Sequence, residues 1–576
     1  MWAKGTMERA PSGSAPAALG GRPERDAVAQ YAAHGDAYPP LSLPEMFSTS
    51  AATDPSAPLV EFLGRSFSYG QIAAQARSIA AGLQAINIGK GDRVGLFLPN
   101  VPLYLSAYYG VLLTGASVVN YAPMWGSVEL AAALAETTPR LVITIDVPAL
   151  LAVVAAARAK APFATLVVGS LAAMLPPLKG LALRLSGRVG RVKGSGIMPL
   201  SALLKRAEPE PVTIDPLRDV AVIQYSSGTT GAPRAVRLSH QNLTANARQL
   251  EEIDPWHGAR DVMVGVIPLA GIFGNSAVLN RTVLDRGCIA LLPQFNPRQV
   301  LATIRRTRAT AMPGIPVMFQ ALLDDPALGR TDLTSLRACI SGAATMPEPL
   351  KRRFEAASGA KLVEGYGLVE AAGVVSVNPF ATPACNGSVG QPLPHTHWTL
   401  LDRDDPSRPA PPDEPGELAV SGPQIMLGYW NDPAADAAAF HDGWLRTGDY
   451  ATIDAQGFAT IVDRRADVMQ VGGVTVFPSR IENVLLGHEE VREAVVIGIP
   501  DAFRGESPKA YVTLRGDSFE TGESLRNWLN GRLPAHNRVL AVEVRDSLPR
   551  SFVGKFDRQA LRLEEAANAR AFNSPG

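Results

Sequence analysis

Short apolar runs rich in β-branched residues alternate with longer Ala- and Leu-rich segments along most of the chain. The runs RVGLFLP, PRLVITI, ATLVVG, VAVIQYS, VMVGVIP, CIALLP and LRACISG have the length and composition of buried strands. Between such runs lie segments with helical character, such as the one from Gln71 to Gln84. Strands that alternate with helices predict parallel-rich sheets covered by helices, so we expect an α/β fold.

The pattern changes after about Asp463. From there the chain offers two helical segments, SRIENVLL and ESLRNWLNGRL, among the strand-like runs REAVVIGI, KAYVTLR and AVEVRD. This mixture predicts a small α+β domain. The first 38 residues are rich in Ala, Pro, Gly and Ser and lack the apolar core of a secretory signal. We therefore predict a disordered tail at 1–38, a large domain at 39–463 and a small C-terminal domain at 464–576.

One long stretch without charge, from Val94 to Val128, raises the alternative of a membrane span. A span needs only about 20 apolar residues, and the segment from Tyr104 to Pro123 has that length. Several Pro, Gly and Asn residues interrupt the stretch, however. We therefore interpret it as a buried strand, a turn and a buried helix.

Composition excludes some classes of protein. The 576 residues include 54 basic and 54 acidic side chains, so the net charge gives no reason to propose a nucleic acid as partner. The three cysteines, Cys288, Cys339 and Cys385, are too far apart for a metal site. With neither a disulfide framework nor a signal sequence, the cytoplasm is the expected compartment.

A basic segment without any acidic residue extends from Val147 to Ala207 and surrounds the apolar run LAAMLPPLKGLALRL. Such a stretch can lie on an anionic membrane surface. It can equally be the solvated face of a packed helix. The sequence therefore leaves open a peripheral contact with the inner face of the membrane through residues 172–206.

A loop rich in hydroxyls and glycine, YSSGTTGAPRAVRLSH, follows one of the predicted strands at Tyr225. Its spacing does not match the phosphate-binding loop of P-loop NTPases, which requires Gly, four residues and then Gly-Lys-Ser/Thr. Its hydroxyls and flexible backbone amides could still surround an anion. An ordinary turn explains the same composition, so the loop alone decides nothing.

Four further motifs follow in order: EGYGLVE from Glu364, DGWLRTGDY from Asp442, DRRADVMQVGG from Asp463 and LPRSFVGKFDR from Leu548. With the loop, they make almost the whole chain resemble the adenylate-forming superfamily. The insert from about Ala172 to Pro211 resembles the long- and medium-chain fatty acid–CoA ligases most closely. The resemblance implies parallel-rich sheets and a distorted barrel in the large domain, followed by a small mobile α+β domain.

The resemblance also implies the reaction. A carboxylic acid and ATP give acyl-AMP and pyrophosphate, and coenzyme A then displaces AMP to give acyl-CoA. ATP, Mg²⁺ and coenzyme A are the implied cofactors and co-substrates. Such chemistry depends on positioning and charge stabilisation.

Roles follow wherever the residues match. The implied catalytic residues are Lys555, Glu370 and Thr230, with Glu370 and Thr230 as Mg²⁺ ligands. The implied nucleotide site comprises Ser226, Ser227, Gly228, Thr229, Thr230, Gly231, Arg234, Ala343, Glu364, Gly365, Tyr366, Gly367, Asp449 and Arg464. In it, Tyr366 would stack on adenine and Asp449 would accept the ribose hydroxyls. Gly271, Gly472 and Gly473 would line the coenzyme A tunnel, and Ala466 occupies the hinge position.

The chain departs from the family pattern at several places. Arg234-Ala235 replaces Lys-Gly, Val369 replaces Thr, Gly271 replaces the His that guards the thiol tunnel, and Arg480 replaces an acid. None of these changes affects Glu370, Asp449, Arg464 or Lys555, so we expect an active enzyme.

The acyl substrate is predicted less sharply than the reaction. The wall from Ile267 to Leu279 has no charged residue and several small ones, which favours a fatty acid. Its length stays open, because one methylene changes the binding free energy by only about 1–3 kcal/mol. Two other functions stay open: an acyl-AMP ligase that loads a carrier protein, and a nucleotide-binding regulator without turnover. A homodimer is also left open.

Overall fold

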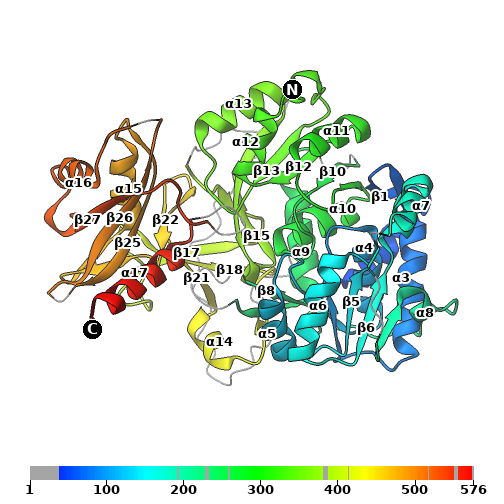
Figure 1. Cartoon of the computed structure of the whole chain (residues 1–576). Helices are drawn as coiled ribbons and strands as arrows, with labels where there is room; N and C mark the ends of the chain where they lie inside the picture. Colours follow the sequence, from blue (N-terminus) through cyan, green and yellow to red (C-terminus); the bar gives the residue numbers. More distant parts are fainter. Residues whose placement is uncertain are drawn as a thin grey trace, which may run out of the picture.

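The computed structural model describes residues 38–187, 189–190, 194–226, 233–256, 260–380, 387–412, 414–501, 503–516, 518–550 and 556–573. Within them a large body built on two mainly parallel sheets is followed by a smaller C-terminal body (Figure 1). Two parts of the predicted site lie outside the described residues. They are residues 227–231 of the predicted phosphate loop and residues 551–555, which include Lys555.

The first sheet has eight strands in the order β19-β9-β8-β4-β3-β5-β6-β7. Most neighbours are parallel, and only the β8–β9 and β9–β19 pairs are antiparallel. The strands are β3 (Arg93–Leu96), β4 (Ser117–Asn120), β5 (Leu141–Ile145), β6 (Thr165–Gly169), β7 (Ile197–Pro199), β8 (Val220–Tyr225), β9 (Ala235–Ser239) and β19 (Gly428–Tyr429).

The second sheet has nine strands in the order β16-β15-β14-β13-β12-β10-β11-β1-β2. Its centre is parallel and its two edges are antiparallel. The strands are β1 (Pro58–Phe62), β2 (Arg65–Ser68), β10 (Val262–Gly265), β11 (Cys288–Leu291), β12 (Ala311–Gly314), β13 (Ala338–Ser341), β14 (Lys361–Leu368), β15 (Gly373–Val377) and β16 (Gln391–Pro392).

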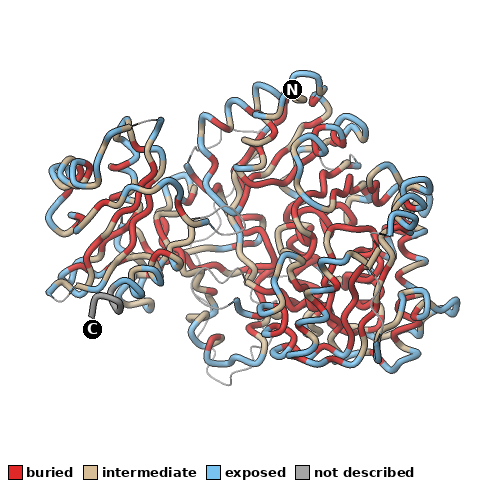
Figure 2. Tube along the Cα trace, in the orientation of Figure 1, coloured by how far each residue is buried: buried red, intermediate tan, exposed pale blue. Residues whose placement is uncertain are grey.

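Helices lie between the two sheets and on their outer faces. The largest apolar core joins both sheets through α2 (Leu43–Thr53), α3 (Tyr69–Gln84), α4 (Pro102–Leu113), α9 (His240–Glu252), the π-helical turn η2 (Gly274–Asn280) and α10 (Arg281–Leu284). A second core covers the first sheet with α5 (Ser127–Thr137) and α6 (Pro148–Lys160). A third covers the second sheet with α11 (Pro297–Thr307), α12 (Pro316–Asp324) and α13 (Glu348–Ser358). Figure 2 shows the buried trace running through these layers.

The uncharged stretch forms β3, a turn and α4, as predicted. Ten of the α4 residues besides its first are buried without an amphipathic pattern, because both faces of this helix pack against protein. Within the described part of the chain, we find no helix with both the length and the apolar composition needed to cross a bilayer.

A third, antiparallel sheet completes the large domain. It contains β17 (His397–Leu401), β18 (Gly416–Ser421), β20 (Phe440–His441), β21 (Trp444–Ile453) and β22 (Ala459–Arg464), with α14 (Pro433–Ala439) beside it. Together with the two larger sheets, it corresponds to the predicted barrel-like part.

The small domain has one sheet in the order β24-β23-β26-β25, with β27 beside β26. Its elements are β23 (Met469–Val471), β24 (Val474–Val476), α15 (Pro478–Leu486), β25 (Val491–Asp501), β26 (Gly505–Leu514), α16 (Gly522–Asn530), β27 (Ala541–Val544) and α17 (Arg558–Asn573). This confirms the predicted α+β character and the overall α/β fold class. The residue limits of the domains stay a prediction.

Candidate active site

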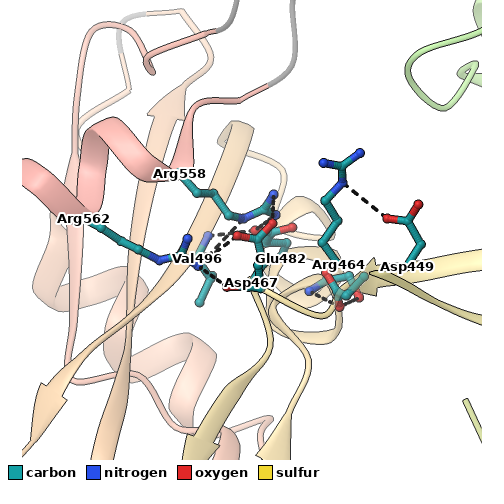
Figure 3. Close-up of polar contacts among 10 residues, drawn as sticks. Asp449, Arg464, Asp467, Glu482, Val496, Arg558 and Arg562 are labelled. Carbon is teal, nitrogen blue, oxygen red and sulfur yellow. Dashed lines mark hydrogen bonds and ion pairs between the residues drawn. The ribbon is translucent and has the colours of Figure 1, made fainter. Parts of the chain in front are cut away.

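Three side chains that the sequence assigned to the nucleotide meet where β14 approaches β21 and β22. Asp449 and Arg464 are cross-strand partners, and the Arg464 Nε lies 3.3 Å from the Asp449 Oδ1. The Tyr366 hydroxyl, from β14, donates to the Asp449 Oδ2 at 2.6 Å. Figure 3 shows Asp449 and Arg464 facing each other across the ribbon. Rigid strands on both sides therefore fix both oxygens of this buried carboxylate.

Glu370 lies in a short turn directly after β14 and is half-buried. Burial raises the pKa of this carboxyl, while the Tyr429 hydroxyl and the charges of Arg464 and Arg234 act in the opposite direction. Tyr429 donates to the Glu370 Oε1 at 3.1 Å. Glu370 is therefore a desolvated acid with cationic neighbours, a setting in which a bound cation would favour the ionised form.

Tyr429 is a residue that the sequence reasoning missed. It lies on β19, which pairs with β9 through Tyr429 and Val236. The Arg234 guanidinium carbon lies 5.3 Å from the centre of the Tyr429 ring. Tyr429 thus connects Arg234 with Glu370. The short run MLGYW carries no recognisable signal for such a role, because the contact depends on a pairing of distant strands.

The neck of the hydroxyl-rich loop is closed by two reciprocal hydrogen bonds. The Ser226 amide donates to the Arg234 carbonyl at 2.9 Å, and the Arg234 amide donates to the Ser226 Oγ at 3.0 Å. The loop members Ser227, Gly228, Thr229, Thr230 and Gly231 lie outside the described residues, as does Lys555. Their predicted phosphate, metal and catalytic roles therefore stay predictions.

The predicted adenine side is built from β13 and β14. Ala343 adopts a left-handed backbone (φ 66°), which is unusual for a residue with a Cβ and typical of functional loops. Burial raises the pKa of Glu364 to about 7. Any Cβ at Gly367 would collide with the Gly373 carbonyl, so β14 and β15 approach each other closely only because this residue is glycine. Gly365 and Gly367 flank Tyr366 on β14.

Buried polar side chains shape the predicted acyl wall after β10. Asn100 accepts from the Leu269 amide at 2.8 Å, Tyr104 donates to the Leu269 carbonyl at 2.9 Å and Gln224 donates to the Ala270 carbonyl at 2.9 Å. These three residues were also missed from the sequence. They satisfy backbone groups of an irregular buried segment, which would otherwise be costly to bury. Gly271 follows in this segment, and a Cβ there would lie 3.3 Å from the Pro268 carbonyl oxygen.

Gly472 and Gly473 form the two-residue turn between β23 and β24. Both have positive φ values, 59° and 79°, and Val471 pairs with Val474 across the turn. This is the geometry of a tight hairpin turn, which two glycines adopt without strain. Nothing lies within 4 Å of a Cβ built at either residue, so their surface is open. Their predicted part in a coenzyme A tunnel stays a prediction, as does the hinge role of Ala466.

The side chains of the candidate site can be compared with the ligands that Mg²⁺ prefers. Among the residues that the structure describes, no group of three or more His, Cys, Asp or Glu side chains gathers around one point. A single carboxylate at Glu370 fits an ion that takes most of its ligands from phosphate oxygens and water. When bound, Mg²⁺ would offset the negative charge of the phosphates.

The arrangement defines a class of protein: an α/β fold with a cluster of buried polar side chains between its sheets and a smaller α+β unit beside them. The AMP-binding enzyme family matches residues 47–430, and its C-terminal domain matches residues 480–555. The chain therefore belongs to the AMP-binding enzyme family, which confirms the predicted superfamily.

Known proteins similar to this chain agree with that assignment. It is 36% identical to a long-chain-fatty-acid–CoA ligase of Bacillus subtilis, over 92% of this chain and 96% of the relative. It is 33% identical to a feruloyl-CoA synthase of Amycolatopsis sp, over 89% and 96%. The solved structure of ATP-bound MatB from Rhodopseudomonas palustris has a TM-score of 0.77 and 27% identity, over 91% of this chain and 99% of that one.

Proposed function

We propose that this protein joins a medium- or long-chain fatty acid to coenzyme A in two steps, with acyl-AMP as intermediate. The observation that supports this most directly is a pair of side-chain clusters in a member of the AMP-binding enzyme family. One cluster contains Tyr366, Asp449 and Arg464. The other contains Glu370, Tyr429 and Arg234. The names of the relatives favour a fatty acid over other acids.

In the first step, a carboxylate oxygen attacks the α-phosphorus of ATP, and the bond to pyrophosphate breaks. Asp449 would accept the ribose hydroxyls and thereby hold the α-phosphate in line with the acid. Arg234 and Lys555 would offset charge that accumulates as two anions approach. Glu370 would hold the metal ion against the phosphates. The chain thus acts by orientation and charge, since no covalent bond to the protein is needed.

In the second step, the sulfur of coenzyme A attacks the acyl carbonyl carbon, the thiol gives up its proton to solvent, and AMP leaves with the bonding electrons. Gly271 places no side chain between the acyl wall and the predicted thiol tunnel. The Gly472-Gly473 turn would border that tunnel after the small domain has rotated.

The first experiment is release of pyrophosphate from purified protein with ATP, Mg²⁺ and acids from butyrate to stearate, with and without coenzyme A. We expect release that requires an acid, and acyl-CoA whenever coenzyme A is present. Release without acyl-CoA would indicate another acceptor, such as a carrier protein. ATP binding without release for any acid would replace the ligase with a nucleotide-binding regulator.

We further propose that residues 172–206 bring the enzyme to the anionic inner face of the membrane from the cytoplasm. Within this segment, α7 (Pro177–Leu185) leaves Leu178, Leu181 and Leu185 exposed at 83%, 55% and 79%. Their spacing places them on one helix face. Lys179 and Arg184 lie on the same helix, and the surrounding sequence has no acid. Exposed apolar side chains with flanking bases complement an anionic lipid surface. Figure 1 places α7 on the side of the large domain away from the small one.

Sedimentation with vesicles tests this contact. We expect the protein to bind phosphatidylglycerol vesicles several-fold more than phosphatidylcholine vesicles. Replacing Leu178, Leu181 and Leu185 together by Gln should abolish that preference, because each buried methylene contributes about 0.8 kcal/mol to membrane binding. The control is Val128→Gln, an exposed apolar residue on α5. Equal binding to both kinds of vesicle, or none, would contradict the proposal. The homodimer stays a prediction.

A further inference from the structure

The large and small domains meet at a compact patch that the reaction does not explain. Tyr450 and Asp463 are cross-strand partners on β21 and β22 of the large domain. The Asp463 Oδ2 accepts hydrogen bonds from the Ser479 Oγ at 2.6 Å and from the Ser479 amide at 3.2 Å. The Tyr450 and Phe477 rings meet edge to face, with centroids 5.7 Å apart. We call these four residues the catch.

The catch provides a hydrogen-bond acceptor for the N-terminus of α15. This helix begins at Pro478, and Phe477 before it provides no side-chain cap. An uncapped helix start leaves amide groups without partners and carries partial positive charge. The Asp463 carboxylate, from the other domain, takes the place of the missing cap. Asp463, Tyr450 and Phe477 are all buried in this arrangement, so separating the domains here would expose an apolar contact and an uncapped helix.

A second group of contacts lies on the small-domain side of the hinge position. Arg562 donates to the Ala466 carbonyl at 3.3 Å and to the Asp467 Oδ1 at 2.9 Å. Arg558 pairs with Glu482 at 2.7 Å and lies 3.7 Å from Asp467. Figure 3 shows both arginines extending from α17 towards Asp467 and Glu482.

The two groups of contacts differ in where their residues lie relative to Ala466. Asp467, Glu482, Arg558 and Arg562 all follow Ala466 in the sequence, so their mutual contacts can persist while the small domain turns. The catch, in contrast, joins residues before and after Ala466. A rotation about residues 464–466 therefore leaves the contacts of Arg558 and Arg562 with Asp467 and Glu482 intact and pulls on the catch. Hinges of this kind concentrate backbone rotation in a few residues.

We propose that the catch holds the small domain in the pose seen here and must open for it to take another, so that Asp463, Tyr450, Phe477 and Ser479 set the balance between the two half-reactions. They are positioning residues, because they act through the placement of the small domain rather than on substrate. The inference rests on the proposed function, in which acyl-AMP formation and thioester formation need different poses of this domain.

Ser479→Ala tests the catch with little risk to folding. The rate of acyl-AMP formation is measured in a single turnover with acid and ATP, and thioester formation is measured separately with synthetic acyl-AMP and coenzyme A. We expect one rate to rise and the other to fall, with their ratio shifted about threefold to tenfold, as loss of one ordinary hydrogen bond predicts. General destabilisation would lower both rates together.

Thr521→Ala is the matched control. Thr521 caps α16 inside the small domain and accepts from the Ser524 amide at 3.1 Å, so this variant loses a helix cap without touching the domain contact. Its ratio of half-reactions should equal that of the wild type. If Ser479→Ala changes both rates by one common factor, or neither, the catch is refuted. A wild-type enzyme that lacks both half-reactions would refute the proposed function as well.

A cross-link provides a second measurement. Asp463→Cys combined with Ser479→Cys should close the catch under oxidising conditions, because the native side chains already touch. We expect the oxidised protein to retain one half-reaction and lose the other, and reductant to restore the lost one. Retention of both in the cross-linked form would overturn the proposal.

Discussion

Two buried aspartates on the same strand ribbon behave differently. Asp449 is held by Tyr366 and Arg464, both from strands of the large domain. Asp463, on the neighbouring strand, is held by Ser479 of the small domain. The first carboxylate is fixed by a rigid frame and suits a ligand that must bind in one place. The second depends on the small domain, which we propose can move. One pair of strands therefore holds both the proposed nucleotide contact and a contact with the small domain.

Removal of the fixed carboxylate should have the largest effect. Asp449→Ala removes the proposed ribose acceptor and its ion pair with Arg464. We expect acyl-AMP formation to fall by at least about 100-fold, in the range seen when a preorganised electrostatic contact is lost. Single-turnover kinetics at saturating acid measures this. Tyr366→Phe keeps the ring and removes only one hydrogen bond, so it should cost about tenfold at most. Equal losses in the two variants would contradict a direct role for Asp449.

Glu370→Gln should come next, because it removes the charge that the proposed metal site provides. We expect the Mg²⁺ concentration for half-maximal activity to rise by about tenfold or more. Titration of activity with Mg²⁺ measures the shift, and binding of ATP without Mg²⁺ serves as the control, since it should change little. An unchanged Mg²⁺ dependence would show that Glu370 is not the metal ligand.

Tyr429→Phe should have a smaller effect of the same kind. It removes the hydrogen bond to Glu370 and keeps the ring beneath Arg234. We expect a loss of about threefold to tenfold in kcat/KM, as for one ordinary hydrogen bond. Tyr429→Leu should cost more, because the cation–π contact with Arg234 disappears too. If the two variants match the wild type, Tyr429 is only a packing residue.

These residues differ in how far the sequence predicted them. The strands and helices follow from apolar runs, because burial is a local property of the sequence pattern. Asp449 and Arg464 lie in motifs and turn out to be cross-strand partners. Tyr429, Asn100 and Gln224 carry no local signal, since each acts through pairing or packing of distant segments. The contact of Asp463 with Ser479 was missed for the same reason. The phosphate loop and Lys555 stay predictions.

The smallest effect concerns pH and the movable carboxylate. Burial raises the pKa of Asp463 to about 7, reinforced by Glu482 on α15 and opposed by the Ser479 hydrogen bonds and Arg558 on α17. If opening the catch exposes Asp463, its pKa falls to the ordinary value near 3.8. The pose with the catch closed, here called docked, then binds the proton more tightly than the pose with the catch open. A lower pH therefore favours the docked pose. The stabilisation of the docked pose is complete below the ordinary pKa and is lost as the pH rises through about 7.

Energy transfer between dyes on the two domains measures this dependence, with labels at Val128→Cys on α5 and Glu523→Cys on α16. Both sites are exposed and outside the proposed machinery. We expect the docked fraction to fall by several-fold between about pH 5.5 and 7.5 and then to level off. Glu364, whose pKa burial also raises to about 7, titrates in the same window, so Asp463→Asn is the control that separates the two. That variant cannot lose a proton at position 463 and should show a flat profile. If its profile matches the wild type, the pH dependence arises from Glu364 or another group. Protonation of Asp463 would then not control the pose of the small domain, and this difference between Asp449 and Asp463 would disappear.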